Sequence, residues 1–231
     1  MKKVTLTIKQ TLRYAFVGLL GLTLLSSCKK DDPYNFEDTI GAEVNFINAS
    51  PDAGSARLYV EDILRTTTGI NYGEASGYQK TYLGDQDVDI RSTTGESTLT
   101  SSQVQFDANN RYTFLLVGQN SSLGLLYFTD DLTVPGAGKA KVRFVNAAPN
   151  ATAATLNSAT GIVVAQQNFR GIAPSTEVNA GAYVLSVVSG TTRSATATVN
   201  LESGKIYTVY AKGLVGGTGN AAFGVGVVAV N

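Results

Sequence analysis

The hydrophobic and polar positions of this chain alternate over short stretches. Val44, Phe46 and Asn48 alternate with Asn45 and Ile47, and no window carries apolar residues at helical spacing over three turns. Gly, Asn, Asp and Ser separate the stretches, as is typical of turns. The pattern therefore predicts an all-β protein. Beyond the first strand, the strands expected in the first part of the chain are 56–60, 88–91, 104–106, 112–117 and 125–129.

The same pattern occurs twice along the chain. Residues 44–53 match residues 142–151 without a gap, and residues 106–113 match residues 201–208. The offset drifts from 98 to 95, which indicates small loop deletions in a shared fold. Six or seven short strands per repeat favour two tandem immunoglobulin-like β-sandwich domains, which we expect at 42–137 and 138–231. After Ala154 the second repeat departs from the first, so the strand expected there has no clear boundaries.

Each repeat also places a tyrosine six residues after an apolar residue, across a polar turn. The pairs are Phe106 with Tyr112 and Leu201 with Tyr207. This spacing resembles the tyrosine corner, in which the tyrosine hydroxyl bonds the backbone of the turn. We therefore expect both hydroxyl groups to stabilise a turn.

The N-terminus has the pattern of a secretory signal. Four basic residues precede the apolar stretch 14–25, which as a helix spans roughly 18 Å and is too short for a bilayer core of ~30 Å. The stretch ends in Leu25-Ser26-Ser27-Cys28, which resembles the bacterial lipobox. We therefore expect a lipoprotein signal peptide at 1–27 and lipid attachment at Cys28, which anchors the mature protein to a membrane. The alternative is a buried cysteine after an ordinary signal peptide.

The anchor is followed by a short charged segment. Lys30, Asp31 and Asp32 resemble the signal that follows the lipidated cysteine in surface-exported lipoproteins of one group of Gram-negative bacteria. The simpler alternative is a solvated tether. We expect residues 28–41 to form the anchor and tether, and the protein to lie on the outer membrane facing the cell exterior.

Composition excludes several classes of function. The chain has no histidine, so it holds neither a Ser/His/Asp triad nor a His-ligated zinc site, and its single cysteine excludes an intramolecular disulfide. Without the signal peptide, 14 basic and 18 acidic residues remain, a net charge of −4 that argues against nucleic acid as a partner. We expect no cofactor, no metal and no enzymatic activity.

Two motifs have simpler explanations than the sites they suggest. Asp85, Asp87 and Asp89 are spaced like calcium ligands, but Ile90 stands where a calcium loop needs Gly, so a solvated strand face is the better account. Residues 217–222 fit the G-x-G-x-x-A pattern of dinucleotide-binding proteins. The β-branched residues that follow predict a hairpin into the last strand instead of a helix.

Two tyrosines occur in only one of the repeats. Tyr78 and Tyr82 lie in a loop region, at positions where the second repeat has Ser175 and Asn179. Exposed loop aromatics bind partners, so this pair is the candidate partner-binding site. The alternative is that both rings pack inside the protein.

The segment Asn-Ala-Ser-Pro-Asp-Ala at 48–53, with residues 56–60 after it, resembles the bacterial domain-of-unknown-function family 4397 over about residues 42–231. The resemblance implies a β-sandwich on an exported protein and brings no catalytic residues. We expect a non-enzymatic lipid-anchored surface protein for adhesion, binding or spacing, with an unknown extracellular protein or glycan as partner. The alternative is a glycan-capture accessory lipoprotein of a surface uptake system.

Overall fold

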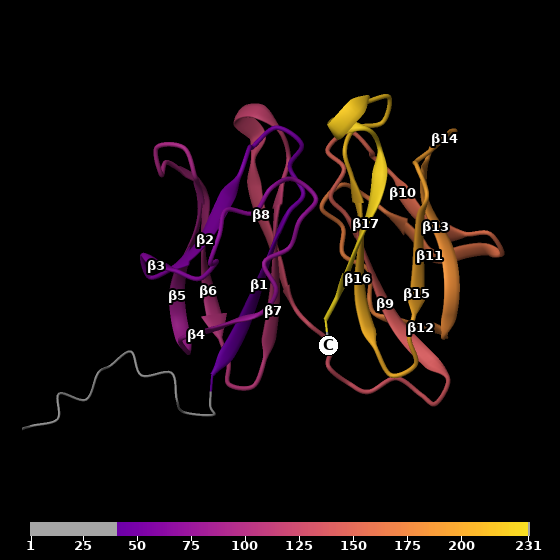
Figure 1. Ribbon diagram of the computed structural model, residues 1–231, viewed down its shortest axis with the longest axis horizontal. Helices are drawn as coiled ribbons and strands as arrows, with labels where there is room; N and C mark the ends of the chain where they lie inside the picture. Colours follow the sequence, from indigo (N-terminus) through magenta and orange to yellow (C-terminus); the bar gives the residue numbers. More distant parts are fainter. Residues whose placement is uncertain (1–40, 231) are drawn as a thin grey trace, which may run out of the picture. The chain divides into compact units, whose positions relative to one another are not determined.

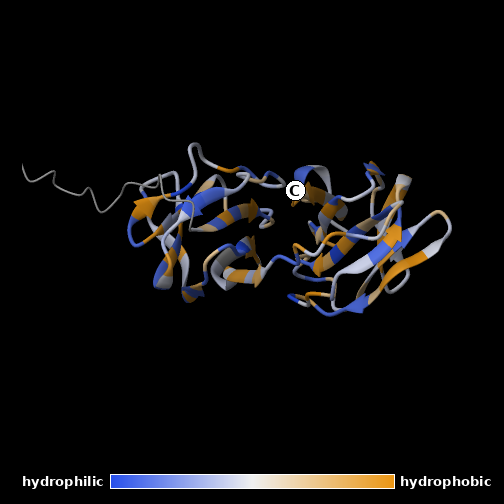
Figure 2. Ribbon diagram, turned by 90° about the horizontal axis from the view of Figure 1, so that it is seen from below, coloured by the Kyte–Doolittle hydropathy of each residue, from blue (hydrophilic) through white to orange (hydrophobic). Residues whose placement is uncertain are grey.

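The computed structural model describes residues 41–230, which all belong to one compact unit (Figure 1). Hydrophobic and hydrophilic residues alternate along its strands (Figure 2). The first half contains β1 (Ala42–Asn48), β2 (Ala56–Val60), β3 (Ile63–Leu64), β4 (Gln79–Thr81), β5 (Gly84–Ser92), β6 (Thr98–Phe106), β7 (Arg111–Val117) and β8 (Gly124–Thr129). The second half contains β9 (Lys139–Asn146), β10 (Ala154–Ser158), β11 (Gly161–Gln167), β12 (Thr176–Asn179), β13 (Gly181–Ser189), β14 (Thr192–Arg193), β15 (Ala197–Leu201), β16 (Ile206–Lys212) and β17 (Gly224–Ala229).

In the first half, two sheets pack face to face. One sheet has the order β4-β1-β7-β8 and the other the order β3-β2-β5-β6. Alternation along each strand turns one set of side chains inward, and fully buried Phe46 and Phe114 from the first sheet share a core with Leu58 and Ile90 from the second. We call the β3-β2-β5-β6 sheet the outer sheet of the first half.

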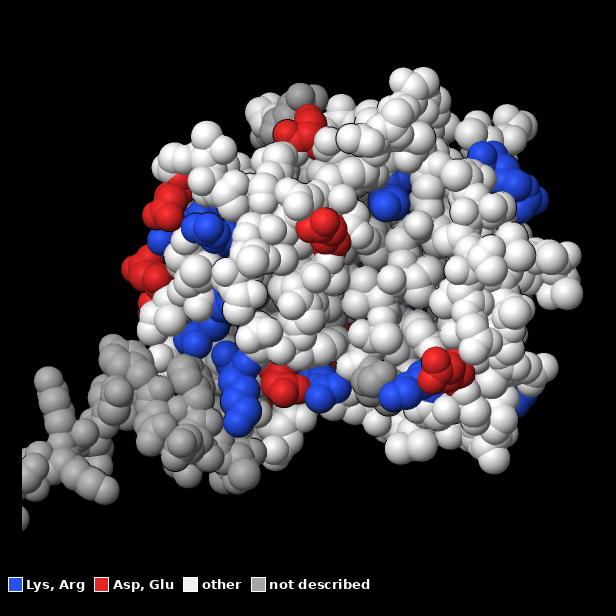
Figure 3. Space-filling view, in the orientation of Figure 1, with Lys and Arg blue, Asp and Glu red and all other residues white. Residues whose placement is uncertain are grey.

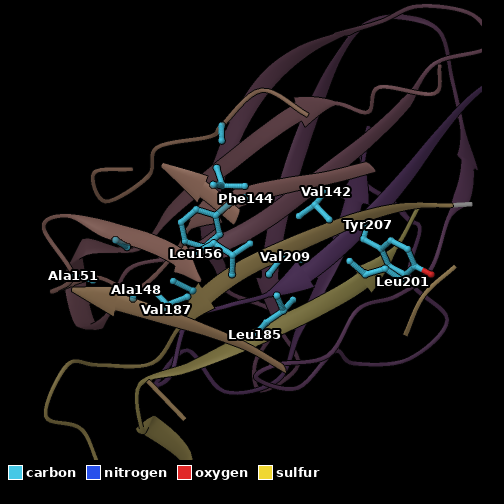
Figure 4. Packing of buried hydrophobic residues seen from close by; sticks show 14 of the residues in the cluster. Val142, Phe144, Ala148, Ala151, Leu156, Leu185, Val187, Leu201, Tyr207 and Val209 are labelled. Carbon is cyan, nitrogen blue, oxygen red and sulfur yellow. The ribbon is translucent and has the colours of Figure 1, made fainter. Parts of the chain in front are cut away.

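The second half has the same strand order. Its sheets are β12-β9-β16-β17 and β11-β10-β13-β14, with β15 also paired to β13, and we call the latter its outer sheet. In Figure 4, Phe144 and Val209 of one sheet lie close to Leu156 and Leu185 of the other. In both halves the first strand pairs in parallel with the strand that begins near the tyrosine, as β1 with β7 and β9 with β16.

The all-β β-sandwich prediction is confirmed, and the strand expected at 56–60 is β2 itself. Every other strand expected in the first part of the chain lies within a longer observed strand. Residues 154–158 form β10 although the second repeat departs from the first there, and β10 pairs with β13 as β2 pairs with β5. The immunoglobulin-like topology and the boundary at 137 stay predictions.

The two tyrosine hydroxyls make the bonds expected of them. The Tyr112 hydroxyl accepts a hydrogen bond from the Asp107 backbone N–H at 2.9 Å, and the Tyr207 hydroxyl accepts one from the Glu202 N–H at 3.0 Å. Tyr112 also packs edge-on against Phe106, with ring centroids 4.9 Å apart. Each tyrosine therefore ties the start of one strand to the turn before it.

A buried asparagine closes the loop after the first strand of each half. The Asn48 side-chain amide donates to the carbonyl oxygens of Gly54 and Ile70 at 2.7 and 3.0 Å, and its Oδ1 accepts from the Ser50 N–H. Asn146 makes the equivalent bonds in the second half, with Ala151, Gln167 and Ala148. Because both side chains are fully buried, these bonds replace the water that the amides lose.

Candidate functional site

The residues expected to anchor and export the protein lie outside the described residues. Cys28, Lys30, Asp31 and Asp32 all precede residue 41. Within residues 41–230, no helix is long and apolar enough to cross a membrane. Lipid attachment, surface export and outer-membrane location therefore stay predictions.

Tyr78 is partly buried, and its hydroxyl group is held by hydrogen bonds. The hydroxyl donates to Asp130 Oδ2 at 2.8 Å and lies 3.1 Å from Thr113 Oγ1 on β7. The guanidinium of Arg111 lies over the ring at 4.9 Å from its centroid. Burial, and the negative charge of Asp130, raise the pKa of the Tyr78 hydroxyl far above its usual value. These contacts favour the packing alternative for Tyr78.

Tyr82 lies just beyond β4 and is also partly buried. The guanidinium of Arg65 sits over its ring, 4.5 Å from the centroid, and Arg65 itself is only 7% exposed. The structure therefore brings each tyrosine under an arginine of the first half. A role for Tyr78 and Tyr82 in binding a partner stays a prediction.

Asp130, which ends the strand region of the first half, is a buried acid. Burial raises its pKa to about 6, although the hydrogen bonds from Tyr78 and Thr113 oppose the rise. The Thr113 hydroxyl donates to the carboxylate at 3.0 Å. Asp130 thus connects the end of β8 to β7 and to the loop before β4.

Asp131 is the next residue, and its hydrogen-bond partners lie in the following segment and in the second half. It accepts a hydrogen bond from the Thr133 hydroxyl at 2.6 Å and one from Lys141 Nζ on β9 at 3.0 Å. The Thr133 bond, supported by Lys141, lowers the pKa of Asp131 to about 2. Asp130 and Asp131 therefore form a joint with one carboxylate fastened to each half.

The two halves also share a cluster of buried apolar side chains, which we call the seam. Its members come from the faces of the β1 and β9 sheets that do not line the sandwich cores. They are Ile47, Ala49, Leu115, Val117 and Phe128 of the first half, and Val145, Ala147 and Tyr210 of the second. The members come largely from matching positions, such as Ile47 with Val145 and Leu115 with Tyr210.

Hydrogen bonds add to the seam. The Tyr210 hydroxyl donates to the Gly73 carbonyl oxygen at 3.1 Å, and Arg143 donates to the Thr129 carbonyl oxygen at 2.8 Å. Sequence reasoning missed the seam. The available signal was the unbroken apolar run at 114–117, because consecutive apolar residues in a strand indicate burial on both faces.

The solvent face of the first outer sheet carries acidic side chains. Val88 and Ile90 of β5 are buried, whereas Asp85 and Asp87 are exposed and Asp89 is partly exposed, as the alternation predicts. Figure 3 shows acidic side chains gathered at the edge of the first half. A hollow of about 320 Å³ lies here, lined by Glu61, Asp62, Asp87, Asp89, Ser101, Ser102 and Gln103.

Part of this acidic charge is compensated. Arg91 forms salt bridges with both Asp62 and Asp89, and its guanidinium lies 4.5 Å from the centroid of the Tyr59 ring. Glu61 accepts a hydrogen bond from the Asp87 N–H at 2.8 Å. Within residues 41–230, no group of three or more acidic, His or Cys side chains is placed to hold a metal ion.

The matching face of the second half carries almost no charge. The five strands of its outer sheet contain a single charged residue, Arg193, whose guanidinium donates to the Ser186 hydroxyl. Where β5 has Asp85, Asp87 and Asp89, the matching positions of β13 are Ala182, Val184 and Ser186. Surfaces of this kind suit recognition of another molecule by contact, because they offer hydroxyl, amide and apolar groups in the open.

Two distant alignments are among the matches to solved structures. The Bacillus anthracis TIE protein is 12% identical at a TM-score of 0.23, over 75% of this chain and 33% of that chain, so this chain spans about a third of its length. A candidate cell adhesion protein from Bacteroides eggerthii is 11% identical at a TM-score of 0.23, over 82% of this chain and 95% of that chain. No curated protein matches.

A family model gives a firmer result. It matches residues 42–157, from the start of β1 through most of β10, and so extends from the first half across the joint into the second. The match includes the Asn48 loop and the Asp130–Asp131 joint. Because it covers half of the chain, the protein belongs to the family of the domain of unknown function DUF4397.

Proposed function

We propose that this protein is a non-enzymatic, lipid-anchored protein of the outer membrane that faces the cell exterior. Its two halves act there as one rigid module that binds an extracellular partner or holds a binding surface away from the membrane. The observation that supports the rigid-module part of this proposal is the seam, because it joins two sandwiches that would otherwise be free to move. A module of fixed geometry holds its two outer sheets at a defined distance and angle to each other.

The seam is apolar enough to keep the halves docked. Strand β7 has Phe114 and Leu116 in the sandwich core and Leu115 and Val117 in the seam, so it is buried on both faces. Burying one such side chain contributes about 1.5–3 kcal/mol. Separating the halves would expose Leu115 and Tyr210 together, which opposes independent motion of the halves.

Anchoring is tested first, on whole cells. The Cys28→Ala variant should appear unprocessed or in the soluble fraction, because it lacks the thiol that receives the lipid. The matched control is Ser27→Ala, which keeps a small residue beside Cys28 and should partition with the membrane as the wild type does. A Cys28→Ala protein that is processed and stays in the membrane would contradict lipid anchoring.

Surface exposure is tested on the same cells with added protease. Intact cells should lose the wild-type protein, while a periplasmic marker protein survives. Protection until the outer membrane is broken would place the protein on the periplasmic face and contradict the export proposal.

The partner class is tested with soluble residues 39–231 on a glycan array and on immobilised matrix proteins. Binding to protein supports adhesion, glycan binding alone supports the capture accessory, and no binding in either format leaves the spacer role. Tyr82→Ala and Tyr78→Phe should both weaken binding if the tyrosine pair contacts the partner. Unchanged binding by both variants would remove the pair from the candidate site.

A further inference from the structure

One edge of the second outer sheet is long, uncharged and exposed. Strand β11 has seven residues, Gly-Ile-Val-Val-Ala-Gln-Gln, and pairs with β10 alone among the described strands. Its Ile162 side chain is 71% exposed, and Ala165 and Gln166 are also exposed. An edge strand leaves a row of backbone N–H and C=O groups without strand partners, which is a template for pairing with another strand.

The other edges on this side of the two sandwiches are short or charged. Strand β3 has only two residues and follows a turn formed by Glu61 and Asp62. Strand β4 has three residues including Lys80, and β12 has four including Glu177. Short length, charge and β-bulges are among the means by which proteins prevent edge pairing. Strand β11 is long and uncharged, and two register shifts on either side of Leu156 interrupt its pairing with β10, so a partner strand has to pair beside these irregularities.

The remaining long edges approach each other across the sandwich. Strand β6 lies near β8, and β15 lies near β17, which leaves less room for another strand at these edges. Strand β11 makes fewer contacts with the facing sheet, through β9. Within residues 41–230 it is therefore more accessible to another strand than the edges of β6 and β15.

We propose that β11 is a docking edge for a second copy of this chain. Two β11 strands pair antiparallel about a two-fold axis, so that the sheet β11-β10-β13 continues into the partner. A two-fold contact uses the same surface on both copies, and therefore needs a surface that does not repel itself. The 26 residues from Phe144 to Phe169, which include all of β10 and β11, contain no charged side chain.

The acidic face of the first half makes this choice of edge specific. Two copies that met through β3 and β5 would bring Asp62, Asp87 and Asp89 toward the same residues of the partner, and like charges oppose such a contact. Two copies that meet through β11 place Ile162 near the partner's uncharged strand. The difference between the halves thus directs self-association to the second half.

This inference goes beyond the proposed function and does not depend on it, because β11 lies entirely within the described unit. If the lipid anchor is also present, both copies are confined to one membrane, which raises their effective concentration. Pairing that is weak in solution would then be sufficient on the cell surface.

The test is sedimentation velocity of residues 39–231, which include both sandwich cores, from about 10 μM to 1 mM. The average mass should rise from one chain to two chains across this range. Ile162→Lys should weaken the association at least tenfold, because it places two like charges at the paired edges. Leu64→Lys is the matched control at the equivalent position of β3, and it should leave the association unchanged.

A second measurement does not rely on charge. Antiparallel pairing about an axis at Val164 places residue 162 of one copy opposite residue 166 of the other. Residues 39–231 contain no cysteine, so each variant Ile162→Cys, Gln166→Cys and Leu64→Cys carries a single thiol. Under oxidising conditions an equimolar mixture of the Ile162→Cys and Gln166→Cys proteins should form a disulfide-linked dimer at least ten times faster than a mixture of the Leu64→Cys and Gln166→Cys proteins. A single-chain mass at every concentration, equal weakening by both lysine variants, or equal crosslinking rates would overturn the proposal.

Discussion

The outer sheets of the two halves have the same strand order and differ in most of the side chains on their solvent faces. On β5 the outward positions are Asp85, Asp87, Asp89 and Arg91, whereas the matching positions on β13 are Ala182, Val184, Ser186, which is buried, and Val188. The inward positions barely differ, since Val88 and Ile90 correspond to the equally buried Leu185 and Val187. Inner residues are constrained by packing, and outer residues are free to serve recognition.

Comparing the two halves also identifies polar residues that both halves share, namely an asparagine and a tyrosine. Asn48 and Asn146, like Tyr112 and Tyr207, make equivalent internal bonds in both halves. Among the polar residues found in one half alone, Asp87 lies on an outer sheet and Asp131 belongs to the joint. A shared polar position therefore marks a structural bond, whereas an unshared one requires its own explanation.

The largest effect should come from the matched core residues. Phe46→Ala and Phe144→Ala each remove a fully buried ring, which should lower the free energy of unfolding by about 3–5 kcal/mol. If the halves are equivalent and joined by the seam, the two losses are similar and each variant unfolds in a single transition. Urea denaturation measures both. Two separate transitions, with only one shifted by each substitution, would show that the halves are independent.

Substitutions of the two joint residues, Asp130 and Asp131, should change the free energy of unfolding in opposite directions as the pH rises. Because the pKa of Asp130 is about 6 instead of its usual 3.8, the folded protein binds more protons than the unfolded chain between these values. The stabilisation is complete below about pH 4 and is lost as the pH rises through about 6. The free energy of unfolding of Asp130→Asn, relative to wild type, should therefore rise by about 2 kcal/mol between pH 4 and pH 7. Parallel stability curves for the two proteins would contradict a buried acid at this position.

Asp131 supplies the internal comparison for that experiment. Its pKa of about 2 lies below the usual 3.8, so its stabilisation is present above about pH 4 and is lost as the pH falls toward 2. Asp131→Asn should destabilise the protein at neutral pH, and this loss should shrink in acid. Measuring both variants across one pH series distinguishes the carboxylate fastened to the first half from the one fastened to the second.

Smaller losses should follow when the loop asparagines are removed. Asn48→Ala and Asn146→Ala each delete two donated hydrogen bonds to carbonyl oxygens, at about 1 kcal/mol for each bond. We expect a loss of about 2 kcal/mol in either half, measured by thermal unfolding. A large loss in one half and none in the other would show that the two loops are not equivalent.

The smallest effect should come from the tyrosine hydroxyls. Tyr112→Phe and Tyr207→Phe each remove one bond to a turn N–H, which should cost about 1 kcal/mol and lower both melting temperatures by similar amounts. Circular dichroism should keep its β-type spectrum in both variants. No change at either position would remove the structural role assigned to these hydroxyls.

Local patterns were sufficient to predict much of this fold. Alternation identified the inward set on β5 and the outward aspartates, and the six-residue spacing identified both tyrosine bonds, because each depends on residues close together in the chain. The α-helix required by the G-x-G-x-x-A pattern is absent at this position, because the three-residue 3₁₀ helix Gly219–Ala221 leads into the strand Gly224–Ala229. These features are fixed by strand geometry and turn chemistry alone.

Long-range contacts could not be predicted in the same way. The sequence identifies Tyr78 only as a loop aromatic. Its hydrogen bond with Asp130, 52 residues away, depends on the complete fold. The run at 114–117 indicates burial on both faces but does not identify Tyr210 as the residue that covers Leu115. Which residues meet across the seam depends on how two finished sandwiches dock, and no periodicity within one strand encodes that.

The central claim is that the seam and the joint make one body of the two halves. Nitrogen-15 NMR relaxation of residues 39–231 tests it most directly, with the Ile162→Lys substitution included so that pairing through β11 does not contribute. We expect the amides of β1–β8 and those of β9–β17 to report the same rotational correlation time, that of a particle containing both halves. Two different and shorter correlation times, one for each half, would contradict it.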